Sequence, residues 1–279
     1  MSGTPVLSVI TASHNRRDLL LRKLDSLVAQ ELQPGLFEWI VCLDGSTDGS
    51  LHALQEALRH SPPAFHVGIT STERRGPGPA RNAAVAQASG RILCFSDDDC
   101  MLESDTLKAH LGAQLEPAIY VGAIHFDVGG RLRKWLPPDP KWWNINGANT
   151  SVPAEAFVRV GGFPDYLEGY GGEDLGLGYL LVKDGLEVRR LADASVTHIG
   201  EATSDRGDPE RWRQAGANAA RMAARHPGMA TRLGVAGWQL GFKRITVPLL
   251  GGRGRWEQAY TEGALAERRR LRAAGKEQG

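Results

Sequence analysis

The chain has 279 residues, of which 42% are apolar, and a formal net charge of +1. This length allows one substantial hydrophobic core and a smaller appended part, and no internal repeat or low-complexity stretch points to a fibrous or disordered protein. Three cysteines are too few for a disulfide framework, and no run approaches the roughly 18 apolar residues of a membrane span, so we expect a cytoplasmic protein.

The near-zero net charge conceals a difference between two parts of the sequence. Residues 211–279 hold 14 of the 33 basic residues but only 4 of the 32 acidic ones. Between residues 211 and 255 there are nine basic residues and no acid, interleaved with Trp238 and Phe242 and followed by Trp256. Such a segment is typical of a solvated helical surface, of peripheral attachment to an anionic membrane at its inner face, or of contact with a phosphate-bearing acceptor. The sequence leaves these interpretations open.

The first two hundred residues alternate short β-rich runs with helical periodicity, a pattern typical of a mostly parallel sheet covered by helices. The expected strands cover residues 6–12, 37–43, 65–69, 91–95 and 187–197. The expected helices carry apolar faces made of Leu20, Leu24, Leu27 and Val28, or of Leu51, Leu54 and Leu58, or cover residues 80–89 and 104–115. Residues 76–78 predict a flexible loop, and residues 116–149 predict an irregular stretch rich in Gly, Pro and Trp. The order of elements predicts an α/β fold with a helical C-terminal extension.

Three consecutive acids, Asp97, Asp98 and Asp99, directly follow the apolar run at residues 91–95. Like charges this close repel one another, at a cost of roughly 1 kcal/mol or more per pair in a partly dry site, unless a cation lies between them. The carboxyl ends of strands are also where open α/β sheets bind ligands. The position of the triplet therefore favours a divalent-metal site over a solvated acidic turn.

Seven short motifs follow one another in a characteristic order. They are SVITASHNR (8–16), DGSTDGS (44–50), GPARN (78–82), FSDDD (95–99), GANTS (147–151), GGF (161–163) and GGEDL (171–175). In this order they resemble the family 2 glycosyltransferases of the GT-A fold, over roughly residues 6–200. The resemblance implies a Rossmann-like, mostly parallel central sheet, and transfer of a sugar, expected to be a hexose, from a nucleotide diphosphate donor, usually with inversion. It also implies a divalent cation, Mn²⁺ or Mg²⁺.

By this resemblance residues 1–115 form the half of the GT-A domain that binds the nucleotide sugar. It places Thr11 and Asp44 beside the nucleobase, where a carboxylate can accept the ring N–H of uracil, so a UDP-sugar is the expected donor. The alternative for Asp44 is a cap on the helix that follows it. The other nucleotide-sugar-binding residues that the resemblance implies are Ser13, Asn15, Arg16, Arg81, Asp97 and Asp98.

The resemblance places the metal on Asp99, with Asp97 as a further ligand and His198 adding an imidazole. A divalent ion would stabilise the negative charge that collects on the departing diphosphate when the glycosidic bond breaks. The alternative for His198, which ends a predicted strand, is an ordinary polar loop residue.

Residues 116–205 are expected to form the acceptor-binding and catalytic half. The resemblance makes Asp174 the general base that deprotonates the acceptor hydroxyl, while Glu173 supports it or contacts the acceptor. Acids at the start of a helix are also favoured by the helix dipole alone, which is the structural alternative for this pair.

The acceptor itself is expected to be a glycan, a lipid-linked molecule or a small molecule, and not a nucleic acid. Sugars stack their C–H faces on exposed tryptophan, so Trp142 and Trp143 are candidates for acceptor binding, together with Asn149. The alternative for the two tryptophans is to close the edge of a core. Residues 206–279 form the basic helical extension.

Other enzyme classes lack their motifs in this sequence. A dinucleotide-dependent oxidoreductase needs Gly-x-Gly-x-x-Gly after the first strand, where this chain has residues 13–16, Ser-His-Asn-Arg, and no P-loop motif occurs. A retaining GT-A transferase, a metal-dependent hydrolase that uses the same acids, and a catalytically silent nucleotide-sugar-binding protein remain as alternatives.

Overall fold

The computed structural model describes residues 4–127, 131–200, 208–247 and 254–277. By packing, the chain divides into two units, one of Met1–Pro164 with Leu177–Ala202 and the other of Asp165–Gly176 with Thr203–Gly279. The assignment of residues 1–115 to the donor and of 116–205 to the acceptor is functional and stays a prediction.

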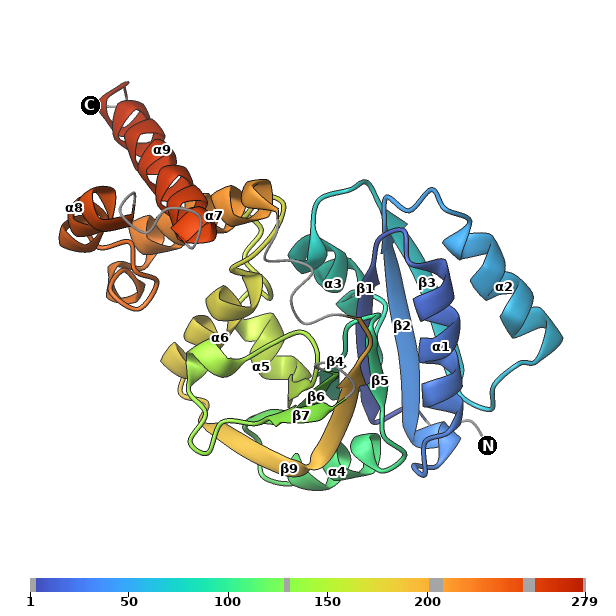
Figure 1. Cartoon of the computed structure of the whole chain (residues 1–279). Coiled ribbons are helices and arrows are strands. Elements are labelled where there is room, and N and C mark those ends of the chain that lie inside the picture. The colour runs from blue at the N-terminus through green and yellow to red at the C-terminus, as the bar shows by residue number, and fades with distance from the viewer. Residues whose placement is uncertain (1–3, 128–130, 201–207, 248–253, 278–279) are drawn as a thin grey trace. The chain divides into compact units, whose positions relative to one another are not determined.

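The first unit is built on a nine-stranded sheet with the order β3-β2-β1-β4-β8-β6-β9-β5, in which β7 pairs with β6 (Figure 1). The strands are β1 (Leu7–Ser13), β2 (Phe37–Asp44), β3 (His66–Thr72), β4 (Ile92–Phe95), β5 (Cys100–Leu102), β6 (Ile119–Asp127), β7 (Leu132–Trp135), β8 (Thr150–Pro153) and β9 (Val188–His198). The first four are parallel, β8 is antiparallel to both β4 and β6, and β9 is parallel to β6. The predicted α/β fold with parallel strands at its centre is confirmed.

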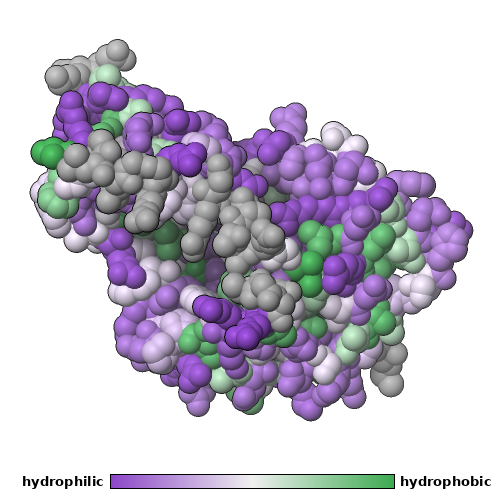
Figure 2. All heavy atoms as spheres, viewed as in Figure 1, coloured by the Kyte–Doolittle hydropathy of each residue, from purple (hydrophilic) through white to green (hydrophobic). Residues whose placement is uncertain are grey.

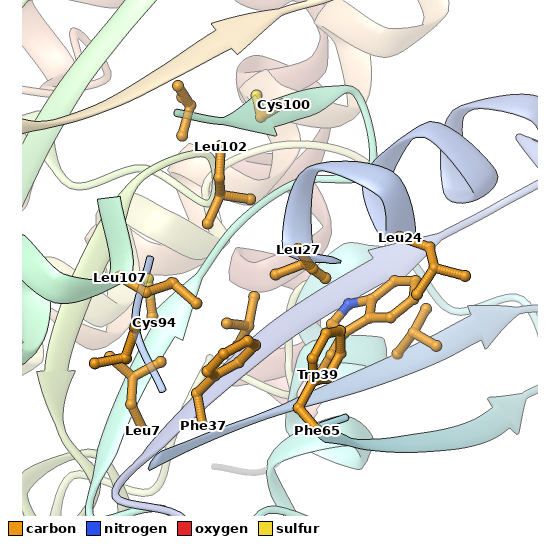
Figure 3. Packing of buried hydrophobic residues seen from close by; sticks show 14 of the residues in the cluster. Leu7, Leu24, Leu27, Phe37, Trp39, Phe65, Cys94, Cys100, Leu102 and Leu107 are labelled. Atoms are coloured by element: carbon orange, nitrogen blue, oxygen red, sulfur yellow. The ribbon is translucent and has the colours of Figure 1, made fainter. Parts of the chain in front are cut away.

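Helices cover both faces of the parallel strands (Figure 1). The α-helices in the described parts of the chain are α1 (Arg17–Val28), α2 (Ser50–His60), α3 (Pro77–Val85), α4 (Thr106–Ala113), α5 (Ala154–Arg159), α6 (Glu173–Lys183), α7 (Pro209–Arg225), α8 (Gly237–Thr246) and α9 (Arg255–Glu277). Because side chains alternate along a strand, Phe37 and Trp39 of β2 pack with Leu24 and Leu27 of α1 (Figure 3), whereas Ile40 belongs to the cluster that includes α3. One sheet thus separates two hydrophobic clusters.

Several predicted boundaries were wrong, for local reasons. Most of the loop predicted at residues 76–78 is the start of α3, because Pro77, rather than Pro79, takes the first helical position, where a missing N–H has no cost. The stretch 116–149 contains β6 and β7, which we did not predict. Gly122 interrupts the apolar run of β6, and it is required because a Cβ there would fall on the side chain of Asn149.

The buried face of α1 also differs from the prediction. Val28 is 60% exposed, while Lys23 has no exposed surface at all. The Lys23 Nζ donates hydrogen bonds to Ser96 Oγ (2.5 Å), to the Asp97 carbonyl (3.1 Å) and to the Cys100 carbonyl (2.5 Å). Burial lowers the pKa of Lys23, although Asp97 and Asp98 act in the opposite direction. This one ammonium group therefore supports the main chain of the turn that carries the three acids.

A second buried polar group ties the mixed half of the sheet together. Asn149 donates its amide N–H groups to the carbonyls of Ala123 (2.9 Å) and Ala194 (3.1 Å), and its Oδ1 is 2.8 Å from His110 Nε2. Because Oδ1 can only accept, we assign the His110 proton to Nε2, and Nδ1 accepts the hydroxyl of Ser151 at 2.8 Å. Burial lowers the pKa of His110 to about 4.

The second unit consists of the C-terminal helices and the segment Asp165–Gly176. Helices α7 and α9 cross with their backbones in close approach, because a Cβ on Gly216 would meet the carbonyl of Tyr260 and one on Gly263 would meet that of Arg213. The predicted helical extension is confirmed. Across the four described ranges, no helix has both the length and the apolar content needed to cross a bilayer.

The Lys23 contacts predict that Lys23→Met lowers the free energy of unfolding by about 2–4 kcal/mol, because three buried oxygen acceptors lose their donor. Urea denaturation measures this change. Arg22→Met is the matched control, since Arg22 is the neighbouring, exposed basic residue of the same helix, and we expect a change within about 0.5 kcal/mol. A Lys23→Met variant as stable as the wild type would contradict the supporting role.

The His110 pKa predicts that acid destabilises the fold between pH 6.5 and about pH 4. In this window the unfolded chain binds a proton at His110 and the folded chain does not, so stability present above pH 6.5 falls by up to about 3 kcal/mol. In urea unfolding at pH 7 and pH 4.5, His110→Gln should lose less stability than the wild type between the two values. His52→Gln, at an exposed position, should follow the wild type. Parallel profiles for His110→Gln and the wild type would show that His110 is not buried as a neutral group.

Candidate functional site

The three acids lie in a turn between β4 and β5, at the edge where the parallel strands end. The Ser96 N–H donates to the carbonyl of Ile10 (3.1 Å), and the Thr11 hydroxyl donates to the carbonyl of Ser96 (2.8 Å). Thr11 is fully buried and also accepts the indole N–H of Trp39 at 3.0 Å. Its observed contacts therefore fix the acid turn to β1, and we do not include it among the residues proposed to contact the nucleobase.

The outer acids, Asp97 and Asp99, each pair with an arginine from a different helix end. Arg81 of α3 lies 2.6 Å from Asp97 Oδ1, and Arg16, just before α1, lies 2.5 Å from Asp99 Oδ2. Arg81 is 4% exposed. The two arginines lower the repulsion that the sequence predicted for this triplet.

The middle acid, Asp98, is held apart from the other two. It is 6% exposed and accepts the Ser13 hydroxyl at 2.6 Å, while Arg16 is 3.5 Å from its Oδ1. Burial raises the pKa of Asp98 to about 7, against the opposite effects of Arg16 and Ser13. Ser13 and Asp98, both predicted as donor-binding residues, thus form a buried pair beneath the acid turn.

The acid turn has the donor atoms of a divalent-metal site. Single ligand atoms of Asp97, Asp99 and Cys100 lie within 4.8 Å of one another, and His198 Nε2 is 3.6 Å from Asp99 Oδ2. The pairing of β5 with β9 brings His198 here, because Cys100 and His198 are register partners. The buried Nδ1 of His198 has no hydrogen-bond partner among the described residues.

This donor set fits a hard or borderline cation. Two carboxylates and an imidazole suit Mn²⁺ and, with more oxygen ligands, Mg²⁺. Burial raises the pKa of the Cys100 thiol well above its usual range. Asp97 and Asp99 lie together at this turn, and His198 lies beside Asp99.

Gly147 of the GANTS motif lies against the pair formed by Arg81 and Asp97. A Cβ on Gly147 would collide with the Arg81 guanidinium and would lie 2.8 Å from Asp97 Oδ1. Asn82 exchanges two hydrogen bonds with the main chain of Phe163, at 2.9 and 3.0 Å. Four of the seven motifs thus meet at one place in the first unit.

The two N-terminal motifs bind each other at the ends of β1 and β2. Asn15 has a positive φ of 53°, which asparagine tolerates better than most residues, and its Oδ1 accepts the N–H of Thr47 at 2.8 Å. Asp44 accepts the N–H groups of Arg75 (2.8 Å) and Gly76 (2.9 Å). Asp44 therefore holds the turn before α3 and does not cap α2, which was the alternative interpretation.

The predicted acceptor residues divide into two groups. Trp142 and Trp143 are half-buried, and Trp142 makes edge contacts with Trp143 (5.3 Å between centroids) and with Tyr179 (5.4 Å). Gly178 of α6 is required beside them, because a Cβ would collide with the carbonyl of Trp142. Asn149 is 1% exposed, and its amide is fully engaged in the network described above, so we do not propose that it contacts the acceptor.

Glu173 and Asp174 occupy the first turn of α6, in the part of that helix that belongs to the second unit. Gly171 and Gly172 precede them with φ values of 90° and 99°, which favour glycine. Negative charge at a helix N-terminus is favourable to the helix dipole, so the two acids suit this position.

The turn before these acids is held by Asn218 of α7. Its Nδ2 donates to the carbonyls of Glu168 (3.0 Å) and Gly171 (2.8 Å), and its Oδ1 accepts the N–H of Glu168 at 3.2 Å. The side chain of Met222, one turn further along α7, leaves no space for a Cβ on Gly172.

Lys23 and Asn218 are the two residues that the sequence interpretation missed. Lys23 lies at i+3 from Leu20, so helical periodicity places it on the buried face of α1 and provides a signal. Asn218 lies within an alanine-rich helix and gives no comparable signal, because its partners are main-chain atoms far away in the sequence.

Comparison with known proteins identifies relatives of this chain. The model for glycosyl transferase family 2 matches residues 8–160, more than half of the chain, and the model for the N-terminal domain of galactosyltransferase matches residues 132–202. Validoxylamine A glucosyltransferase of Streptomyces hygroscopicus subsp. limoneus is 28% identical over 66% of this chain and 49% of its own length. The chain spans about half the length of the curated relatives that it matches first.

Solved structures show the same fold. The mannosyltransferase PcManGT from Pyrobaculum calidifontis, solved with GDP-Man and Mn²⁺, has a TM-score of 0.64 at 20% identity, over 95% of this chain and 87% of that one. TarS from S. aureus, solved with UDP-GlcNAc, has a TM-score of 0.63 at 19% identity, over 91% and 79% of the two chains. With its family model matched over more than half of its residues, the chain belongs to glycosyl transferase family 2.

Proposed function

We propose that this chain transfers a sugar from a nucleotide diphosphate donor to an acceptor hydroxyl, with a divalent cation held at the acid turn. The observation that best supports this proposal is the acid turn, where Asp97 and Asp99 lie together and each pairs with an arginine, and where His198 lies beside Asp99. These residues combine the ligands for a metal with cations for a diphosphate. Relatives of this chain are named as glycosyltransferases, and structural neighbours were solved with nucleotide sugars.

Asp97, Asp99 and His198 would hold the metal, Mn²⁺ or Mg²⁺. When bound, the cation would supply positive charge to the diphosphate as it departs. Arg16 and Arg81 lie at the same turn, and their guanidinium groups can exchange a carboxylate partner for phosphate oxygens.

The donor is proposed to be a UDP-sugar. Asp44 ends β2 at the same sheet edge, and its carboxylate is oriented by two main-chain N–H groups, which leaves lone pairs for the ring N–H of uracil. Asn15 fixes the adjoining turn. Ser13 and Asp98 are proposed to act on the donor by holding the acid turn in place.

Transfer is proposed to proceed with inversion, with Asp174 as the general base. A carboxylate at a helix start can accept the proton of the acceptor hydroxyl as that oxygen attacks the anomeric carbon. Glu173 is proposed to support Asp174 or to bind the acceptor. The half-buried aromatic group of Trp142 and Trp143 offers faces on which a sugar acceptor can stack.

The metal assignment predicts that Asp99→Ala weakens the binding of UDP in the presence of Mn²⁺ by at least about 10- to 100-fold. A loss of this size is typical when a residue that only supports a metal ligand is removed, so removal of a ligand should cost at least as much. Titration calorimetry with and without Mn²⁺ measures this. Asp105→Asn, an exposed acid beyond the turn, should bind as the wild type does. Wild-type binding of UDP that is unaffected by EDTA would contradict the metal site, and a preference for GDP over UDP would contradict the reading of Asp44.

The base assignment predicts that Asp174→Asn keeps the metal-dependent binding of UDP and lowers turnover by about 10²–10⁴-fold, because only proton transfer is lost. Slow hydrolysis of a UDP-sugar, chosen from a panel of nucleotide sugars, measures turnover before the acceptor is known. Glu173→Gln should lose less turnover than Asp174→Asn.

Equal loss of UDP binding in Asp99→Ala and Asp174→Asn would show that the roles of metal ligand and general base are wrongly assigned. If no donor were hydrolysed, a catalytically silent binding protein would be favoured. The anomeric proton coupling of the product separates inversion from retention.

A further inference from the structure

Helix α8 presents an apolar stripe on the side opposite to its own packing. Trp238, Phe242 and Ile245 follow one another at i, i+4 and i+7 and are 70%, 64% and 71% exposed, whereas Leu240 and Val247 on the other side are buried. We call the three exposed residues the α8 stripe. Figure 2 shows hydrophobic surface at the left edge of the molecule, at the place of α8 in Figure 1.

Exposure of this kind is uncommon on one short helix. Single exposed apolar side chains are normal in folded proteins, but clustered ones mark surfaces that contact something else. In the described part of the chain, three of the large apolar side chains that are exposed belong to this ten-residue helix. Tryptophan is also the residue that favours the boundary between lipid and water, because its ring is apolar and its N–H is polar.

The charge around the α8 stripe indicates what covers it. Of the nine basic residues between 211 and 255, Arg213 and Arg221 of α7 pair with glutamates that lie outside this range. Arg244 on α8 and Arg232 shortly before it are exposed, while Lys243 is paired with Glu257 at 2.7 Å. A second copy of this chain would bring like charges together across the contact, whereas anionic lipid headgroups are complementary to them.

We propose that the α8 stripe docks this chain on the surface of an anionic lipid bilayer. The three apolar side chains enter the headgroup region, and the surrounding arginines contact the anionic headgroups. The helix lies in the plane of the interface, as expected for an amphipathic helix with a basic surround that is too short to span a bilayer. This proposal does not depend on the transfer reaction proposed above.

Co-sedimentation of the full chain with vesicles tests the proposal. The wild type should bind phosphatidylcholine vesicles that contain phosphatidylglycerol, should bind pure phosphatidylcholine less, and should dissociate as salt is raised. Replacing Trp238, Phe242 and Ile245 together by Ser should weaken binding to the anionic vesicles by at least about tenfold. Arg244→Gln should weaken it less and should reduce the salt dependence.

The first unit offers a matched control. Leu115 and Leu132 are 82% and 65% exposed, so Leu115→Ser with Leu132→Ser removes exposed apolar surface outside the α8 stripe and should leave vesicle binding unchanged. Circular dichroism checks that each variant is folded, and Ile245→Ser alone serves if the triple variant is not.

Depth in the bilayer gives an independent measurement. Brominated lipid should quench part of the tryptophan fluorescence of the wild type, and Trp238→Phe should remove that part while binding is retained. The proposal is overturned if the wild type does not bind anionic vesicles at low salt, or if the triple variant binds as well as the wild type. It is also overturned if sedimentation equilibrium shows a dimer that the triple variant loses, because the α8 stripe would then be an interface between copies.

Discussion

The chemistry of the candidate site depends on one turn that carries three consecutive carboxylates. Neighbouring residues offset the electrostatic repulsion among these carboxylates and so stabilise the turn. Lys23 supports this turn from inside the protein, with its ammonium group on three oxygen atoms of residues 96–100. Arg16 and Arg81 neutralise the outer acids, and burial favours the protonated form of Asp98. The two outer carboxylates are thus presented together, while the negative charge of the middle one is reduced near neutral pH. A site built in this way can accept a cation without first having to overcome the repulsion of three anions.

Much of this arrangement could be predicted from the sequence, because it follows from strand ends. The apolar run at residues 91–95 identifies a buried strand, and the parallel order of β1, β2 and β4 brings their following polar residues to one edge. The ordered motifs predicted the family, which the comparison confirmed. The sequence could not show what each polar group binds, since Thr11 and Asn149 match binding motifs and yet spend their hydrogen bonds on the protein itself. The tertiary fold determines which residues far apart in the sequence form hydrogen bonds. Hydrophobic periodicity predicts helices and strands but not these partners.

In the mixed half of the sheet, β9 was predicted, whereas β5, β6, β7 and β8 were not. β6 carries a glycine in its middle, and β5 and β8 are only three and four residues long. The network of His110, Asn149 and Ser151 ties β8 to β6 and β9, where hydrophobic alternation alone would not define the register. In the sequence, Gly122 indicates a loop. In the structure it lies within β6 and leaves room for the side chain of Asn149.

The contacts of Asn218 connect the C-terminal helices to the segment that carries the proposed general base. The region matched by the model for glycosyl transferase family 2 ends at residue 160. The backbone just before Asp174, however, accepts a hydrogen bond from Asn218 of α7, a helix that starts at residue 209. Helix α7 therefore supports the segment that carries the proposed general base. A substitution in these late helices can therefore change the position of the acid at the start of α6 without altering any of the seven motifs.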